Sequence, residues 1–313
     1  MDIVGIGVSV WDRVVTLDEF PAEGNVVRAK SAMSGLGGGV AVATATAAML
    51  GCSAALVDSL GTDEAGERIV RRLTSVGVDV SAIERHDHLT SSTASIWSSL
   101  ESSERTIAYV AGTACEQLSW SPSVGDALRQ AAIIHTNGRH KPIWRRAIDI
   151  AEDNAIKLSF DGGAHRFRDE IVPLLMASDI VIVARQFAET FLDCYQPSGP
   201  SAQSCGQLVR RIRGLLKAEI LGVTDGAKGS FFIGSDDSVH HQPAIKVERA
   251  VETTGCGDTF HGGFLAGHVR GLSLEDSAAL ASEVASRNAR SVGALALEKS
   301  SIEDLVVTTD EPE

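Results

Sequence analysis

The chain has 313 residues, of which 44% are hydrophobic and 22% charged, and its formal net charge is −13. This composition is ordinary for a soluble globular protein, and the length predicts one large domain with an appendage, or two domains. The negative charge argues against nucleic acid or an anionic membrane as a partner, because both attract basic surfaces.

The cysteines and the N-terminus bear on the cellular compartment. The five cysteines lack metal-ligand spacing and predict no disulfide framework; they are Cys52, Cys115, Cys194, Cys205 and Cys256. The first residues, MDIVGIGVSVWD, lack the basic start of a signal peptide and predict a strand. With no apolar run of membrane-spanning length, the expected location is the cytoplasm.

Short apolar runs alternate with helical patterns along the chain. The runs predict buried strands at residues 2–8, 54–60, 131–137, 156–162, 179–184 and 219–226. The intervening segments predict helices at residues 41–50, 65–77, 142–154 and 204–217. Such alternation predicts a doubly wound α/β fold, with a mostly parallel sheet and helices on both faces. Ligands are then expected at the carboxyl ends of the strands.

Two segments depart from this alternation. Residues 11–34 and 89–112 are rich in β-branched residues, alternate in part, and contain turn residues, which predicts antiparallel hairpins. Although they are far apart in the sequence, they can meet as a small β-sheet lid that excludes water from a site. The alternative is a pair of edge hairpins without a functional role.

The stretch AVETTGCGDTFHGGF, residues 250–264, places small residues directly before an acid and a helical pattern. Free backbone N–H groups and the helix dipole at such a start favour an anion, and glycines allow it to come close. We therefore interpret Gly255, Cys256 and Gly257 as an anion cradle with Asp258 at its rim. The alternative is a turn in which Asp258 only caps the helix.

Three further polar or glycine-rich sites accompany this one. Asp12 follows the first strand, Gly37, Gly38 and Gly39 begin a helix of small residues, and a turn between two strands contains Thr224, Gly226 and Gly229. A single glycine run is weak evidence, because tight packing also selects small residues. Four such sites in this order are more specific.

With these motifs the chain resembles the ribokinase-like (PfkB) family of carbohydrate kinases over nearly its whole length. ETTGCGDTFHGGF resembles the C-terminal signature of that family, GGGVAVATATAAMLG its N-terminal signature, and VTDGAKG its nucleotide-side turn. The resemblance implies a ribokinase-like α/β kinase domain over residues 1–313 that phosphorylates a hydroxyl of a sugar or sugar derivative. It also implies ATP and Mg²⁺ as cofactors and a small-molecule sugar substrate. The apolar residues expected to be exposed on the lid segments predict a homodimer through the lid.

The resemblance also implies roles for individual residues. Asp258 matches the catalytic base, and the N–H groups of Gly255, Cys256 and Gly257 match the anion hole for the transferring phosphoryl group. The residues that match the sugar site are Asp12, Gly38 and Gly39. The residues that match the nucleotide site are Thr224, Gly226, Gly229, Asn288 and Gly293.

The chain departs from the family pattern in three places. Val42 stands where the family has an Asn that binds sugar hydroxyls. The motif near the magnesium site begins with Gln186 instead of Asn but keeps the carboxylate of Glu189. Glu252 replaces an Asp, and with Thr254 it is expected to border a potassium site. The longer side chain of Glu252 is expected to make the activity depend less on potassium.

The acceptor is the least determined part of the interpretation. GVSVWDR and HHQPAIKVERAVETTGCGDTFHGG also look similar to the sulfofructose kinase branch, which implies that Arg139 pairs with an anionic group of the substrate. The competing interpretation is that Arg139 is a surface residue. The chain is also compatible with a nucleoside kinase of the same superfamily. A non-catalytic sugar-binding regulator is disfavoured, because Asp258 is present.

Overall fold

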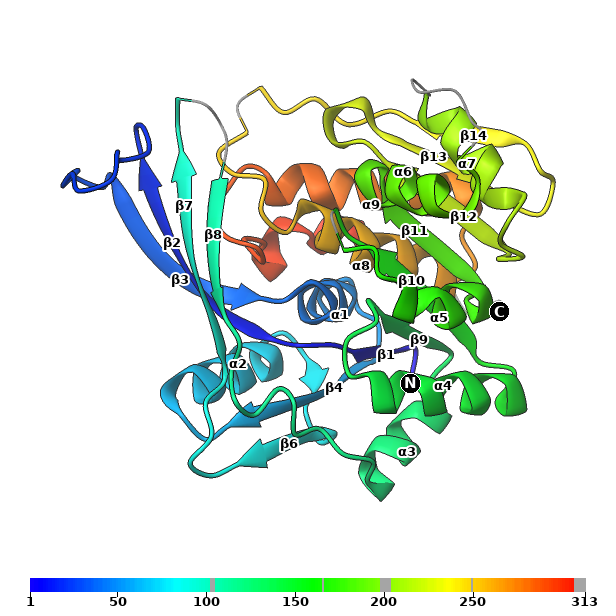
Figure 1. The fold of residues 1–313 in the computed structure, drawn as a ribbon, viewed down its shortest axis with the longest axis horizontal. Helices are drawn as coiled ribbons and strands as arrows, with labels where there is room; N and C mark the ends of the chain where they lie inside the picture. The colour runs from blue at the N-terminus through cyan, green and yellow to red at the C-terminus, as the bar shows by residue number, and fades with distance from the viewer. Residues whose placement is uncertain (102–104, 165, 198–203, 249, 307–313) are drawn as a thin grey trace.

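The structure, a computed structural model, describes residues 1–101, 105–164, 166–197, 204–248 and 250–306. A ten-stranded central sheet runs through it in the order β14-β13-β12-β11-β10-β9-β1-β4-β5, with β6 also pairing with β4 (Figure 1). The strands are β1 (Ile3–Ile6), β4 (Ala54–Gly61), β5 (Val78–Asp79), β6 (Ile83–His86), β9 (Ile133–Thr136), β10 (Lys157–Gly162), β11 (Ile180–Ala184), β12 (Ile220–Thr224), β13 (Ser230–Ile233) and β14 (Val239–Gln242).

The sheet is mostly parallel, which confirms the predicted fold class. All pairs from β12 to β5 are parallel, and only β13 and β14 add antiparallel strands at one edge. The helices are α1 (Gly39–Met49), α2 (Glu64–Ser75), α3 (Pro122–Arg129), α4 (Lys141–Asn154), α5 (Val172–Ala177), α6 (Arg185–Tyr195), α7 (Cys205–Arg213), α8 (Cys256–Val269) and α9 (Leu274–Asn288). Short 3₁₀ turns are η1 (Asp169–Ile171), η2 (Gly226–Lys228), η3 (Lys299–Ser301) and η4 (Glu303–Leu305).

Both faces of the sheet are covered. On β11, Ile180 and Ile182 belong to the same apolar cluster as Phe264 of α8, whereas Val181 and Val183 belong to another with Phe187 of α6. Because successive strand residues point to opposite faces, this alternation places the two helices on opposite sides of the sheet. A strand buried on both faces is continuously apolar, as the IVIV run predicts.

Helices α1 and α8 pack unusually closely, and this packing positions the site. Every residue of α1 is buried, and a Cβ added at Gly262 of α8 would lie 2.4 Å from the carbonyl oxygen of Ala43. The small residues of α1 therefore serve helix packing. The result is that the N-terminal ends of α1 and α8 lie side by side (Figure 1).

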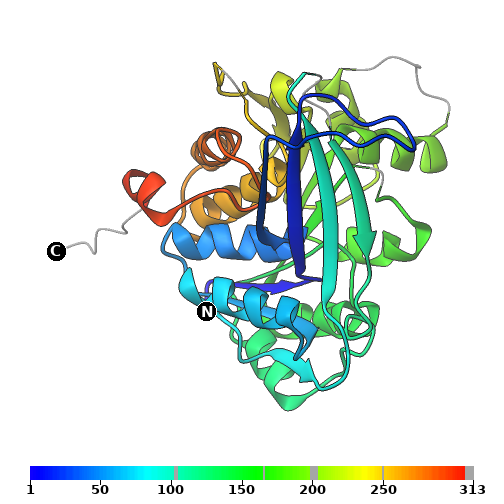
Figure 2. The same ribbon diagram turned by 90° about the vertical axis from the view of Figure 1, so that its left-hand side faces the viewer.

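The lid is a separate four-stranded sheet in the order β3-β2-β7-β8 (Figure 2). Its strands are β2 (Val10–Leu17), β3 (Ser31–Gly37), β7 (Ser92–Ser99) and β8 (Arg105–Val110). β2 and β3 form one antiparallel hairpin, β7 and β8 form the other, and β2 pairs with β7 in parallel. The two predicted hairpins therefore do meet in one sheet, although residues 102–104 lie outside the described part.

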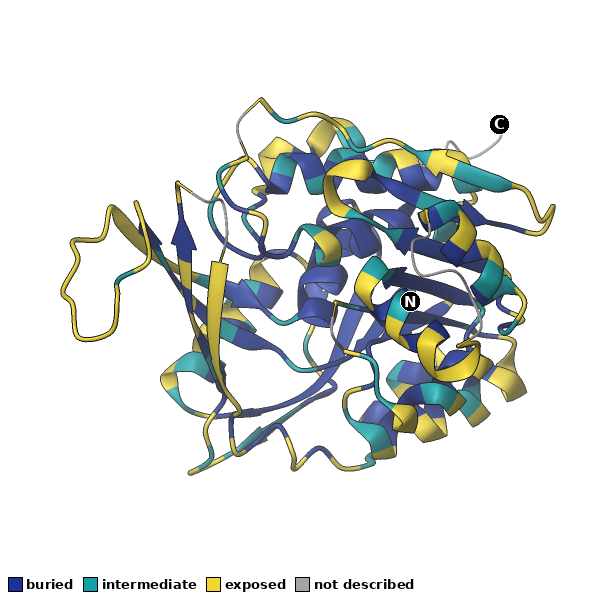
Figure 3. Cartoon of the chain, turned by 45° about the horizontal axis from the view of Figure 1, so that its top comes forward, coloured by how far each residue is buried: buried dark blue, intermediate teal, exposed yellow. Residues whose placement is uncertain are grey.

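The lid has a buried apolar cluster and an exposed edge strand. Val10, Val14, Ala94 and Ile96 form a small buried cluster, whereas every residue of β8 is exposed (Figure 3).

Among the described residues, no helix combines the length and the apolar character that crossing a bilayer requires.

Candidate active site

The first turn of α8 presents Asp258 at the carboxyl end of the central sheet. Gly255, at the N-cap, has a φ of 74°, and a Cβ there would lie 2.0 Å from the carbonyl oxygen of Ala294, so only glycine fits. Gly257 is exposed, and a Cβ on it would meet nothing within 4 Å. The N–H of Cys256 donates to the carbonyl oxygen of Thr253 at 3.3 Å, so of the three predicted cradle residues Gly257 faces the most open space.

The start of α1 lies directly against Asp258. A Cβ on Gly39 would lie 2.7 Å from Oδ1 of Asp258 and 3.4 Å from both Arg166 Nη1 and Asp161 Oδ2. Burial, and then the negative charge of Asp161, raise the pKa of Asp258, while Arg166 is the largest opposing influence. Three charged side chains therefore converge on the space that the missing side chain of Gly39 leaves open.

The lid supplies a second acid to the same region. Asp12 of β2 is only 5% exposed, and a Cβ on Gly37 would lie 2.0 Å from its Oδ2. Burial, followed by the charges of Asp258 and Glu252, raises the pKa of Asp12 to about 7. Gly38, with a φ of 91°, makes the turn from β3 into α1. The structure thus brings together the predicted residues Asp12, Gly38, Gly39 and Asp258.

Sequence reasoning missed a buried pair beside Asp258. His261 Nε2 lies 3.2 Å from Asp161 Oδ1, and both side chains are almost fully buried. His261 follows Asp258 by three residues on α8, a spacing that puts both on one helix face, so helical periodicity could have found it. Asp161 lies in β10 just before the strand ends, where the parallel sheet predicts ligand-binding loops.

The predicted nucleotide turn lies between β12 and β13. Thr224 ends β12, Gly226 begins η2 with a φ of 51°, and Gly229 has a φ of 88°. A Cβ on Gly229 would lie 2.2 Å from the carbonyl oxygen of Gln242, so this turn requires glycine. The turn is open at Gly226, where a Cβ would meet nothing within 4 Å.

Glu189, the predicted magnesium ligand, is joined to this turn by an arginine. Arg185 Nε lies 2.8 Å from Glu189 Oε1, and its Nη1 lies 2.9 Å from Asp225 Oδ2. No group of three or more His, Cys, Asp or Glu side chains among the described residues has the arrangement of a metal site. Glu189 therefore offers a single carboxylate, which suits a cation held mainly by phosphates and water.

Asn288 and Gly293 are placed where they organise the α8 loop. The Asn288 amide, fully buried, donates to the carbonyl oxygens of Thr254 and Ala294, both at 3.2 Å, and accepts from the Ala296 N–H at 2.9 Å. All these partners are backbone groups. Asn288 thus holds the loop before Asp258, and a direct contact with nucleotide stays a prediction.

Glu252 closes the same loop. Its Oε1 accepts the Thr254 N–H at 2.7 Å and its Oε2 accepts the Gly293 N–H at 3.0 Å. Thr254 Oγ1 is buried and has no hydrogen-bond partner in the described ranges. The carboxylate therefore links the segment of Thr254 to that of Gly293, and a potassium ion beside Glu252 and Thr254 stays a prediction.

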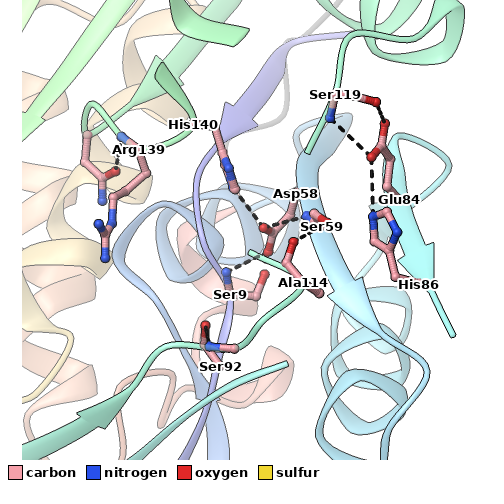
Figure 4. A network of polar contacts seen from close by, with 12 residues as sticks. Ser9, Asp58, Ser59, Glu84, His86, Ser92, Ala114, Ser119, Arg139 and His140 are labelled. Carbon is pink, nitrogen blue, oxygen red and sulfur yellow. Dashed lines mark hydrogen bonds and ion pairs between the residues drawn. The ribbon is translucent and has the colours of Figure 1, made fainter. Parts of the chain in front are cut away.

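Arg139 and His140 follow β9 but point in different directions (Figure 4). His140 Nε2 lies 3.0 Å from Oδ1 of Asp58, which is fully buried on β4. The exposed Arg139 points away from Asp58, and its N–H donates to Asn137 Oδ1 at 3.3 Å. The arginines whose charges act on Asp258 are Arg166 and Arg105, so substrate binding by Arg139 stays a prediction.

Comparison with known proteins identifies the family and the fold. The family model described as "pfkB family carbohydrate kinase" matches residues 2–300. A nucleoside kinase of Methanothermobacter thermautotrophicus is 28% identical over 295 residues, which cover 91% of this chain and 88% of that protein. The adenosine kinase of Sinorhizobium meliloti has a TM-score of 0.81 at 22% identity, covering 97% and 98% of the two chains. Arabidopsis thaliana ribokinase, solved with ribose and ATP, has a TM-score of 0.80 at 22% identity, covering 98% and 99%.

Proposed function

Because the chain belongs to the PfkB family of carbohydrate kinases, we propose that it transfers a phosphoryl group from ATP to a sugar hydroxyl, with Asp258 as the base. The observation that carries the proposal is the position of Asp258 in the first turn of α8, with its Oδ1 2.7 Å from the Cβ that Gly39 lacks. A hydroxyl placed there reaches the carboxylate and the helix N-terminus together.

The two parts of this arrangement have different roles. Asp258 orients the acceptor hydroxyl and takes its proton as the new bond forms. The N–H groups at the start of α8, chiefly that of Gly257 and with Gly255 and Cys256 beside it, stabilise the negative charge of the phosphoryl group in transfer. The lid strands keep water from competing with the acceptor, and Asp12 contributes a carboxyl group to the acceptor from the lid side.

ATP is the donor that kinases of this family use. We assign its site to the β12–β13 turn around Thr224, Gly226 and Gly229, with Asn288 and Gly293 holding the neighbouring loop. Glu189 is the side chain that would hold Mg²⁺ through its carboxylate. A bound Mg²⁺ neutralises phosphate charge on the donor.

Two acceptor classes have specific support. Val42 is fully buried on α1 and cannot supply the amide that binds hydroxyls in the resembling kinases. The 28% identity to a nucleoside kinase favours an acceptor whose sugar carries a base. An anionic sugar bound by Arg139, as in the sulfofructose kinase branch, is the second candidate, because its exposed guanidinium is available to a bidentate anion.

The test is a panel of acceptors assayed by ADP release, comprising ribose, fructose, adenosine, inosine, a sugar acid and a sugar sulfonate. Phosphorylation of a nucleoside or a neutral sugar in preference to the acidic sugars removes the Arg139 alternative. Asp258→Asn is expected to lower kcat by about two to four orders of magnitude while ATP affinity is kept.

The matched control is Asp153→Asn, an exposed aspartate near the end of α4 that should change nothing. Retention of more than about a tenth of kcat in Asp258→Asn would exclude it as the base. Failure of every acceptor would favour the non-catalytic regulator instead.

The lid is also the proposed dimer contact. Its exposed side chains include Trp97 at 41%, Ile107 at 49% and Val110 at 62%. By the strand register, Trp97 and Val110 lie on one face of the sheet and Ile107 on the other. Exposed apolar side chains on one face are typical of a surface that another chain covers. A homodimer through the lid strands, within a single kinase domain over residues 1–313, is the arrangement that we propose.

A further inference from the structure

The buried pair of Asp161 and His261 lies beside the proposed base. Asp161 is 4% exposed and His261 5%, and the pair joins β10 to α8 across 3.2 Å. His261 approaches Asp161 Oδ1, whereas Oδ2 lies 3.4 Å from the Cβ that Gly39 lacks, on the same side as Asp258. One oxygen therefore faces the histidine, and the other faces the reaction site.

His261 is one of two neighbouring buried histidines. Its ring centroid lies 5.5 Å from that of His135 on β9, whose Nδ1 is 3.0 Å from Ser159 Oγ. Burial, and then the positive charge of His261, lower the pKa of His135 to about 3, so His135 stays neutral. Burial also disfavours the charged form of His261, but Asp161 and then Asp258 outweigh it and raise its pKa.

The remaining charges near Asp258 come from other elements. Arg166, in the segment after β10, and Arg105, on β8 of the lid, bring positive charge, and Asp12 on β2 brings a carboxyl group. Arg166 lies within 3.4 Å of the same point at Gly39 as Asp161. Asp161 is thus an acidic group immediately beside the base, and His261 is the basic side chain that contacts it directly.

We propose that the Asp161–His261 ion pair is a positioning element that sets how readily Asp258 accepts the proton of the acceptor hydroxyl. The proposal rests on the proposed function, because it takes Asp258 as the base. Two like charges that share a site hinder each other's ionisation, and an opposite charge relieves this. With His261 in place, Asp161 is fixed and its charge is compensated; without His261, Asp161 repels the ionised form of Asp258.

The test is a titration of Asp258 by NMR in the full-length protein with ¹³C-labelled aspartate. The Asp258 signal is assigned by its absence in Asp258→Asn. In His261→Gln the midpoint should rise by about one pH unit or more, because the negative charge of Asp161 is left uncompensated. In the double variant Asp161→Asn, His261→Gln both charges are gone, and the midpoint should return to the wild-type value or below it.

The opposite shifts of the Asp258 midpoint in the single and the double variant distinguish an electrostatic effect from damage to the fold. Damage to the fold would disturb the Asp258 midpoint more in the double variant than in the single one. His135→Gln is the matched control: it replaces a neutral histidine of the same cluster and should leave the midpoint unchanged. An unshifted midpoint in His261→Gln, or an equal shift in the double variant, overturns the proposal.

A check without any variant uses ¹⁵N signals of the wild-type imidazoles. His261 should titrate above the ordinary histidine value of about 6.5, and a midpoint at or below that value overturns the proposal. The result that would contradict the proposed function is a different one. In that case Asp258→Asn would stay active, whereas His261→Gln would still shift the midpoint of Asp258. The pH profile of kcat should follow the NMR, its acid limb moving upward in His261→Gln.

Discussion

Two buried Asp–His pairs lie at the carboxyl side of the central sheet, and they differ in what surrounds the aspartate. Asp58 and His140 are 3.0 Å apart, and Asp161 and His261 are 3.2 Å apart. Oδ2 of Asp58 accepts the Ser9 N–H at 2.7 Å, and its Oδ1 accepts the Ser59 N–H at 2.7 Å in addition to its contact with His140. Asp161 instead keeps Oδ2 directed at the space beside Asp258.

The difference indicates that a buried Asp–His pair can have either of two roles: it can hold chain segments together, or it can change the electrostatic environment of a neighbouring group. Ser9 lies just before lid strand β2, and Ser59 Oγ donates to the carbonyl oxygen of Ala114, just after lid strand β8, at 2.7 Å. Asp58 and its neighbour Ser59 therefore tie the chain segments that flank these two lid strands to the central sheet (Figure 4). A carboxylate whose two oxygens both accept backbone N–H groups is fixed in place. A carboxylate with one oxygen free of such donors can act through its charge on a neighbouring group.

The largest effect on stability is expected at Asp58. Asp58→Ala leaves two backbone N–H groups and His140 without their buried acceptor, which should lower the free energy of unfolding by about 3–5 kcal/mol. Urea denaturation measures it. The control, Asp126→Ala, breaks an exposed pair with Arg129 at 3.2 Å and should cost about 1 kcal/mol or less. Equal losses in the two variants would contradict the anchoring role of Asp58.

The next largest effect is expected at Gly39, which faces Asp161 and Asp258. In Gly39→Ala the new Cβ would lie 2.7 Å from Asp258 Oδ1, so the carboxylate must move. We expect kcat/KM to fall by at least about tenfold, because small displacements of reacting groups are costly. Thermal stability should change little, since Ala favours the helix.

Gly206→Ala is the matched control for Gly39→Ala. Gly206 lies in α7, and a Cβ there would make its closest contact at an ordinary 3.6 Å, so activity should be unchanged. Full activity of Gly39→Ala would mean that the charged groups do not meet the acceptor at this point.

The smallest effect concerns Glu252, which resembles Asp58 because both its oxygens accept backbone N–H groups. The carboxylate already joins the segments at Thr254 and Gly293, so a potassium ion is not needed to do so. Replacing K⁺ by Na⁺ in the assay should leave kcat unchanged within error. A clear loss of kcat in Na⁺ would instead indicate that Thr254 Oγ1, which has no hydrogen-bond partner in the described residues, is a ligand of the potassium ion.

The sequence by itself determined the alternation of strands and helices, the two hairpins and the motif from Gly255 to Asp258. These are local properties: apolar periodicity and glycines before a helix act within a few residues, so they can be recognised in the sequence. The glycine at position 255 illustrates this, because the positive φ of the turn before α8 is a local property that favours glycine.

Only the tertiary structure decided which distant polar residues meet. The parallel pairing of β2 with β7, the antiparallel edge strand β14 and the contact of Asp161 with His261 all depend on the order of strands in the sheets. A buried Asp or His has no periodic signal of its own, since its burial is favourable only when a partner from another element is present. The roles of Asp58 and Asp161 differ for that reason: besides His140 at the start of α4, Asp58 has the backbone N–H groups of Ser9 and Ser59 as partners, whereas Asp161 contacts His261 of α8.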